Sequence, residues 1–207
     1  MGAQQTYEWA ARFPEMVPRA ASFAGTARTP VHNQIFVDTH LELLTSDPAF
    51  ADGFYADSAE VRLGLKRLAV AFSLMGLSAA FWRAEGWRAL GFASADGFRQ
   101  GFIRDYFAPM DPNNLISQAR KWRSGDLAAH ADGDLAAALA RISAQFFVVP
   151  FSTDLFFPPE DCEADCRLLP NGHYRPIETP IGHFAMFCLR PEDQDAIDAV
   201  IAELLAA

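Results

Sequence analysis

Two residues of this chain have the types and positions needed for proton transfer, Asp154 and His183. Asp154 stands in the run FSTDLFFPPED, directly after a buried strand predicted over Gln145 to Phe151. His183 stands in PIGHF, just after a strand predicted to end at Glu178. Open α/β sheets place their sites beyond the carboxyl ends of parallel strands, so both residues occupy site positions. There, an aspartate can fix the tautomer of an imidazole, which can then take a proton from a nucleophile.

The alternative interpretation of the same two residues is structural. Asp154 would then cap the helix that follows Pro158, and His183 would be an ordinary loop residue. Position along the chain leaves both interpretations open.

The elements that must position these residues alternate between strand and helix at both ends of the chain. The pattern predicts a helix over Gly2 to Arg12, which ends at Phe13-Pro14, and a buried strand over Arg19 to Gly25. Further on it predicts four more elements besides the strand at Gln145: helices over Leu135 to Ile142, Pro158 to Leu168 and from Pro191 onward, and a strand over Tyr174 to Glu178. Strand–helix–strand order at this spacing predicts parallel strands joined by crossovers, and therefore the α/β class.

The middle of the chain, from Val31 to about His130, is helical and irregular in pattern. Asp111-Pro112 marks one helix start, and an apolar stripe at spacings of three and four marks another helix; the stripe consists of Val61, Leu65, Leu68, Ala69 and Phe72. We therefore expect a core domain formed by 1–30 and 131–207, interrupted by a helical insertion over 31–130.

The composition of the chain disfavours some classes of binding partner. Lys and Arg number 17 and Asp and Glu number 26, a formal net charge of −9, which disfavours nucleic acid and anionic lipid surfaces. The first residues lack the basic and apolar regions of a secretory signal peptide, and the three cysteines are too few for a disulfide framework. We expect a cytoplasmic protein that acts on a small molecule, without a membrane or nucleic-acid partner.

Several stretches resemble one family. Residues 152–161 and the run Gly182-His183-Phe184-Ala185 resemble the Asp and His ends of α/β-hydrolase fold proteins, specifically the homoserine O-acetyltransferase-like branch. The first ten residues, MGAQQTYEWA, resemble the stretch that directly follows the nucleophilic serine in that branch. Residues 111–115 and 122–126 resemble its return from lid to core.

The resemblance implies a Ser-Asp-His triad with Asp154 and His183 as two members. The elbow of that branch usually reads Gly-x-Ser-Met-Gly, so the serine would stand immediately before Met1, with Met1 and Gly2 next to the elbow and the oxyanion site. The chain as written then lacks its nucleophile and is expected to be inactive, either because the start codon is assigned too late or because this is a gene fragment. Two features agree: the strand at Arg19 becomes an unprotected edge, and the first helix starts without a capping side chain.

The resemblance also bears on the substrate. The acetyltransferases carry an acidic residue directly after the catalytic His, where this chain has Phe184, and the Arg-Tyr-Asp element of the lid return reads Arg123-Ser124-Gly125-Asp126. Because both departures remove polar groups for a charged amine, we expect an ester or thioester of a less polar acid, either hydrolysed or transferred to another acceptor. A non-catalytic remnant or binding module is the alternative function.

The insertion is rich in aromatic residues, among them Trp82 and Trp87, which is typical of a lid over a site. The alternative is a homodimer contact, because exposed aromatic surfaces also mark interfaces.

No cofactor or metal is expected. Cys162 and Cys166 share a helix face but have no second ligand pair, so we interpret them as free thiols. His32 and His40 lie in the first helical region of the insertion; the default interpretation is surface residues, and the alternative is residues of the lid or pocket. Glu192, Asp193 and Asp195 are interpreted as charges suited to the start of the last helix.

Overall fold

The computed structural model describes residues 1–206, which divide into two compact units. Unit 1 consists of Met1–Thr29, Gly76–Ala80 and 125–206, and unit 2 of Pro30–Met75 and Phe81–Ser124. The sequence places Gly76–Ala80 inside the helical insertion, whereas in the structure this short segment packs with unit 1.

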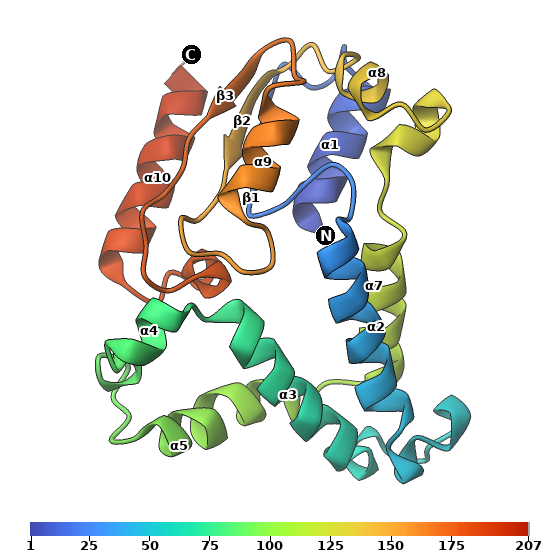
Figure 1. The fold of residues 1–207 in the computed structure, drawn as a ribbon, viewed down its shortest axis with the longest axis vertical. Helices are drawn as coiled ribbons and strands as arrows, with labels where there is room; N and C mark the ends of the chain where they lie inside the picture. The colour runs from blue at the N-terminus through green and yellow to red at the C-terminus, as the bar shows by residue number, and fades with distance from the viewer. Residues whose placement is uncertain (207) are drawn as a thin grey trace. The chain divides into compact units, whose positions relative to one another are not determined.

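Within the described residues, the strands of unit 1 form one parallel sheet in the order β1-β2-β3 (Figure 1). The strands are β1 (Arg19–Phe23), β2 (Gln145–Val149) and β3 (Gly172–Tyr174). Arg19 pairs with Gln145, and Phe146 with Gly172, so the carboxyl ends of the strands lie at one edge. β2 lies in the middle because it can be buried on both faces: Phe146, Phe147, Val148 and Val149 are all at most 1% exposed.

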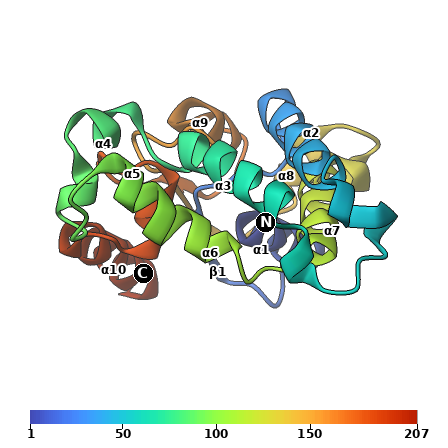
Figure 2. The same ribbon diagram turned by 90° about the horizontal axis from the view of Figure 1, so that it is seen from below.

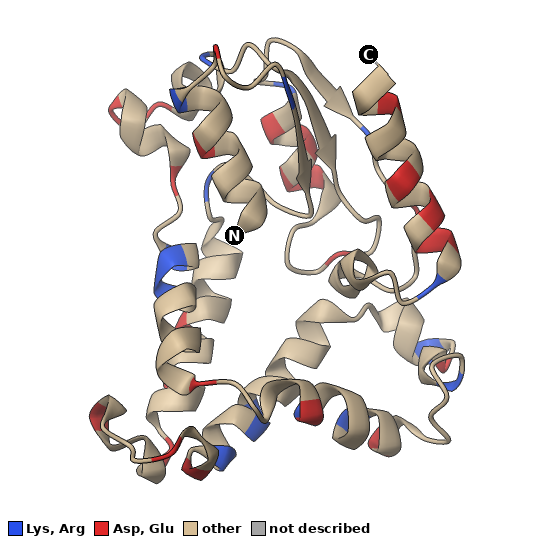
Figure 3. Cartoon of the chain, turned by 180° about the vertical axis from the view of Figure 1, so that it is seen from behind, with Lys and Arg blue, Asp and Glu red and all other residues tan. Residues whose placement is uncertain are grey.

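Helices cover both faces of this sheet. The helices of unit 1 are α1 (Gly2–Arg12), α8 (Leu135–Leu139), α9 (Pro159–Cys166) and α10 (Pro191–Ala206). On one face, Tyr7 of α1 stacks on Phe146 with ring centroids 4.7 Å apart. On the other, the Arg175 guanidinium lies 5.0 Å above the Phe147 ring and pairs with Glu203 of α10. Figure 3 shows acidic residues along α10, and Glu192 and Asp193 lie in its first turn, where the helix dipole favours negative charge.

The predicted helix over Gly2 to Arg12 is confirmed to the residue, and no side-chain hydrogen bond caps its start at Met1. In the part of the chain that the structure describes, β1 pairs only with β2, as expected for an edge strand.

The predicted strand over Tyr174 to Glu178 is wrong in its bounds. The regular strand is β3, and Pro176 interrupts it because proline has no N–H to donate. The chain nevertheless follows β2 further: Arg175 N donates to Val148 O at 2.9 Å, and Ile177 N donates to Pro150 O at 2.9 Å. An isolated parallel bridge joins Phe151 to Ile177, so the loops beyond both strands leave the sheet in register.

The regular elements of unit 2 are all helical within its described residues. Its helices are α2 (Val31–Thr45), α3 (Arg62–Gly76, of which the last residue belongs to unit 1), α4 (Ala79–Arg83, likewise shared), α5 (Ala95–Phe98), α6 (Asp105–Phe107) and α7 (Pro112–Arg123). A π-helical stretch over Arg99–Arg104 joins α5 to α6, and short 3-10 turns occupy Pro48–Gly53, Ser58–Glu60 and Gly86–Arg88. In unit 1, further 3-10 turns span Leu127–Ala131 and His183–Phe187.

Helices α2 and α7 pack side by side (Figure 1 and Figure 2). Phe36 and Trp122 meet with ring centroids 5.9 Å apart, and Arg123 donates two hydrogen bonds to Asp38, at 2.6 and 3.1 Å. The side chain of Asp111 caps α7 by accepting from Asn114 N, as its position before Pro112 predicts.

The interpretation of His40 as a surface residue is wrong. His40 lies on the buried face of α2 and is 5% exposed, with its ring 6.0 Å from that of Phe72. Burial lowers the pKa of this imidazole to about 4, so it is neutral at pH 7.

The aromatic residues of the insertion form a core of their own. Trp82 contacts three rings, those of Phe81, Trp87 and Phe98, at centroid distances of 5.4 to 5.9 Å. Trp87 is only 8% exposed and Phe98 is fully buried. Trp87 is therefore a packing residue within unit 2, and the homodimer contact stays a prediction.

Candidate active site

The structure brings Asp154 and His183 into direct contact. His183 Nδ1 and Asp154 Oδ2 are 2.8 Å apart. The Asp154 side chain is fully buried, whereas that of His183 is 15% exposed. With Nδ1 engaged by the carboxylate, Nε2 is the ring nitrogen that can accept a proton from a nucleophile.

Asp154 is held by its own loop as well as by the imidazole. Its second carboxylate oxygen, Oδ1, accepts from Phe156 N at 2.8 Å and from Phe157 N at 3.0 Å. The interpretation of Asp154 as the cap of the helix after Pro158 is wrong, because Oδ1 binds the loop residues Phe156 and Phe157 and no side chain caps α9 at Pro158. Its role in catalysis stays a prediction. Two backbone donors and one imidazole supply the hydrogen bonds that a buried carboxylate needs.

The imidazole of His183 is enclosed by two rings of the Asp154 loop. Its centroid lies 4.9 Å from that of Phe156 in an edge-on arrangement and 5.7 Å from that of Phe157. The same two residues thus donate backbone N–H groups to the carboxylate and pack their side chains on the histidine. This restricts the ring to the orientation in which Nδ1 faces Asp154.

Two hydroxyl side chains, those of Ser152 and Thr153, tie the Asp154 loop to the His183 loop, and a third, that of Thr179, binds within the His183 loop. Thr153 Oγ1 donates to Thr179 O at 2.7 Å, and Thr179 N donates to Ser152 Oγ at 3.1 Å. Thr179 Oγ1 in turn accepts from Ile181 N at 3.2 Å. Sequence reasoning missed these residues, although Ser152 and Thr153 directly precede the predicted acid and Thr179 lies four residues before the histidine.

Phe184, which follows the histidine, does not offer a free apolar surface. It is 6% exposed, its ring lies 5.3 Å from that of Phe187, and it packs against Gly76. Position 184, where the resemblance would place an acidic group, is therefore occupied by a buried phenylalanine that packs the loop against Gly76.

The other predicted site residues, Met1 and Gly2, lie at the start of α1, where Met1 O accepts from Gln5 N at 3.1 Å. Their role beside an oxyanion stays a prediction.

The two cysteines of α9 form no disulfide. Cys162 and Cys166 are both buried and free, and burial raises the pKa of each. Within residues 1–206, no group of three or more His, Cys, Asp or Glu side chains is arranged to hold a metal ion. In the same residues, no helix is both long and apolar enough to cross a bilayer.

Comparison with known proteins gives the site a context, although no protein-family model matches the sequence. Ethyl acetate hydrolase from Pseudomonas veronii is 47% identical over the whole chain, which spans 59% of that protein. A homoserine O-succinyltransferase from Litchfieldella anticariensis is 33% identical over 93% of the chain, which spans 53% of that enzyme.

Among solved structures, an acetylester hydrolase from Corynebacterium glutamicum superimposes with a TM-score of 0.99 at 44% identity, over all of this chain and 59% of that one. The chain thus spans little more than half the length of the relatives it matches, and its fold is consistent with a C-terminal portion of theirs. The chain belongs to the α/β-hydrolase fold proteins, in the branch that includes ester hydrolases and the homoserine O-acyltransferases.

Proposed function

We propose that Asp154 and His183 are the acid and base of a Ser-Asp-His triad, and that the protein in its longer form hydrolyses short, uncharged acyl esters. The observation that carries this proposal is the 2.8 Å contact between His183 Nδ1 and a fully buried Asp154 carboxylate. The serine is proposed to stand immediately before Met1, in the part of the relatives that this chain does not span.

In this proposal each proton has a defined path. His183 Nε2 takes the proton of the serine hydroxyl as its oxygen attacks the ester carbonyl, and Asp154 stabilises the resulting imidazolium. The proton then passes from Nε2 to the departing alcohol, which leaves an acyl-serine. Water, deprotonated by the same nitrogen, releases the acid and restores the serine. The backbone N–H of Met1 is proposed as one donor to the carbonyl oxygen as it becomes negative.

Hydrolysis is favoured over transfer to homoserine by the surroundings of the histidine. An ammonium group bound in a low-dielectric site needs an anionic partner. Position 184 carries a buried phenylalanine packed on Gly76, so it supplies no such partner. An uncharged ester requires none, and the relative from Pseudomonas veronii bears the name of an ethyl acetate hydrolase.

We further propose that unit 2 serves as the lid of this enzyme. Unit 2 has an aromatic core of its own around the buried Phe98, which contacts Trp82. This supports its assignment as a separate helical unit, as a lid requires.

The test is p-nitrophenyl acetate hydrolysis by the 207-residue chain and by a form extended at its N-terminus to include the serine. We expect activity only in the extended form, and its loss in the His183→Ala variant of that form. The matched control is His130→Ala, because His130 pairs with Glu8 at 2.9 Å on the outside of unit 1. Absence of activity in both forms would favour the non-catalytic alternative.

A further inference from the structure

The turn between α3 and α4 lies against the loop that carries His183, and the contacts are made by Ser78. Ser78 N donates to Ile181 O at 3.0 Å, and Ser78 Oγ donates to Pro180 O. Ser78 is 3% exposed, so both hydrogen bonds are shielded from water. One residue thus holds two successive carbonyls, and the second lies two positions before the histidine.

A pair of glycines lets the two segments meet backbone to backbone. Gly182 has φ +89, and a Cβ there would lie 2.9 Å from Ser78 N and 3.1 Å from Gly76 O. A Cβ on Gly76 would lie 2.3 Å from the Phe184 ring. The residues on both sides of His183 therefore touch the segment Gly76–Ala80, and neither glycine has room for a side chain.

Together with the hydroxyl ties on the other side, these contacts enclose the loop. Thr179 O accepts from Thr153 in the Asp154 loop, whereas Pro180 O and Ile181 O accept from Ser78. Three consecutive carbonyls are therefore fixed before the chain turns at Gly182 and presents the imidazole. The hydrogen bond with Asp154 fixes the position of Nδ1 only. The direction in which Nε2 points also depends on the backbone of the loop, which these carbonyl contacts hold.

We propose that Ser78 is a positioning residue for His183: by holding the carbonyls of Pro180 and Ile181, it sets where Nε2 points. The proposal rests on the proposed function, since it assigns Ser78 a part in the same triad. It also gives a segment of the sequence insertion a direct part in that function, because the turn at Gly76–Ala80 packs with unit 1. In this role Ser78 acts through the backbone that carries the imidazole.

The first measurement needs no serine. In the 207-residue chain, the Nδ1–H proton that bridges to Asp154 should give a far-downfield proton NMR signal. We expect this signal to broaden or disappear in Ser78→Ala, because the loop gains freedom, and to persist in Ser78→Thr, which keeps the hydroxyl. The matched control is Ser73→Ala: Ser73 is as deeply buried, at 2%, and lies on helix α3 just before the turn of Ser78, but its hydroxyl donates to Val70 O at 2.7 Å.

The second measurement uses the extended, active form. Ser78→Ala should lower kcat for p-nitrophenyl acetate by about 10- to 100-fold while KM changes less than about twofold, the signature of a misplaced base rather than weaker binding. Gly76→Ala, which presses on Phe184 from the same side, should lower kcat in the same way. Ser73→Ala should keep kcat even if it loses as much stability as Ser78→Ala.

The results separate the two proposals. A Ser78→Ala variant that is less stable but keeps both the downfield signal and kcat would make Ser78 merely structural and overturn the inference. A wild-type chain without the downfield signal, or an extended form without activity, would instead contradict the proposed triad itself.

Discussion

Asp165 of α9 offers a test of the energetics of the fold that does not depend on catalysis. Its side chain is buried, at 6% exposure, and its Oδ2 accepts from Ala27 N at 2.7 Å. Burial, with a smaller contribution from Asp161, raises the pKa of this carboxyl from 3.8 to about 6, against the opposing effects of Ala27 N and Arg28. Between about pH 4 and pH 6, the folded protein thus holds a proton at Asp165 that the unfolded chain has already lost.

The sign of the effect on stability follows from this difference. A carboxyl whose pKa is higher in the folded state favours folding while it is protonated, and this stabilisation is lost as pH rises through the folded-state pKa. The window runs from about pH 4, near the ordinary pKa of an aspartate, to about pH 6, the pKa of Asp165 in the folded protein. At about 1.4 kcal/mol per pKa unit, a shift of about two units means that the free energy of unfolding is lower by about 3 kcal/mol at pH 7 and above than it is below pH 4.

Replacing Asp165 with Asn removes the charge and keeps an oxygen for Ala27 N. The new amide group must find a hydrogen-bond partner, which offsets part of the gain by about 1 to 2 kcal/mol. We therefore expect Asp165→Asn to unfold with a free energy about 1 to 2 kcal/mol higher than wild type at pH 8. At pH 4 we expect the advantage to disappear.

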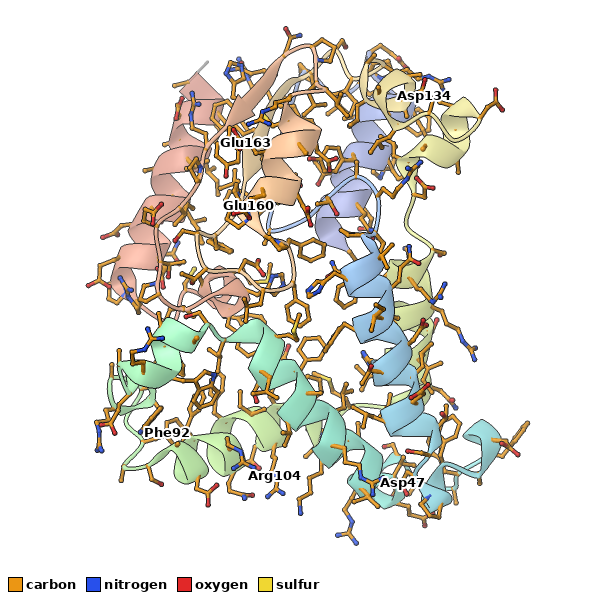
Figure 4. All side chains as sticks on the ribbon, in the orientation of Figure 1. Asp47, Phe92, Arg104, Asp134, Glu160 and Glu163 are labelled. Carbon is orange, nitrogen blue, oxygen red and sulfur yellow. The ribbon has the colours of Figure 1, made fainter. Side chains whose placement is uncertain are left out.

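The assay is urea unfolding of both proteins at pH 4, 6 and 8. The control is Glu160→Gln, an exposed acid on the same helix, whose carboxylate can remain solvated in both states (Figure 4). This control should change stability by less than about 0.5 kcal/mol at each pH. If the difference between Asp165→Asn and wild type is the same at all three pH values, the buried carboxylate is not the penalised group and the reasoning is refuted.

Three further predictions concern the site and the insertion. Asp154→Asn in the extended form should lower kcat by roughly 10³- to 10⁴-fold in an ester hydrolysis assay. The amide oxygen is claimed by the two backbone donors at 2.8 and 3.0 Å, so its NH₂ faces His183 Nδ1 and forces the proton onto Nε2; an unchanged kcat would contradict the proposed role. Gly182→Ala should lower both kcat and the unfolding temperature, because φ +89 and a contact of 2.9 Å to Ser78 N oppose a side chain; normal kcat with native stability would refute this. Asp47→Ala should cost about 2 to 3 kcal/mol in urea unfolding, since it strands Ala49 N and Gly64 N, whereas Asp47→Asn should cost less; Figure 4 marks this residue.

Much of the fold could be predicted from local patterns. The helix over Gly2 to Arg12 follows from its apolar face and the Phe13-Pro14 stop, and both signals lie within a few residues of what they define. The position of Asp154 and His183 also could be predicted, because parallel strands bring their carboxyl ends to one edge. Short-range chemistry and one rule of topology were sufficient for both.

Other features depend on contacts that no local pattern encodes. His40 is polar and falls on a helix, and only the packing of α2 against Phe72 makes it a buried group. The strand expected through Glu178 stops early because Pro176 cannot donate. Ser78 lies more than a hundred residues from its partner Pro180, so its part in the His183 loop is visible only in three dimensions.

The way in which the His183 loop is fastened has a use in enzyme engineering. Ser78 and Thr153 hold the loop by hydrogen bonds to the backbone carbonyls of residues 179 to 181. Because every amino acid has a backbone carbonyl, these bonds do not depend on which side chains the loop carries. The side chain of Pro180 is exposed and takes no part in these bonds. A library randomised at position 180 should therefore yield many folded variants in which the exposed surface of the His183 loop is changed while the hydrogen bonds that hold the loop are kept.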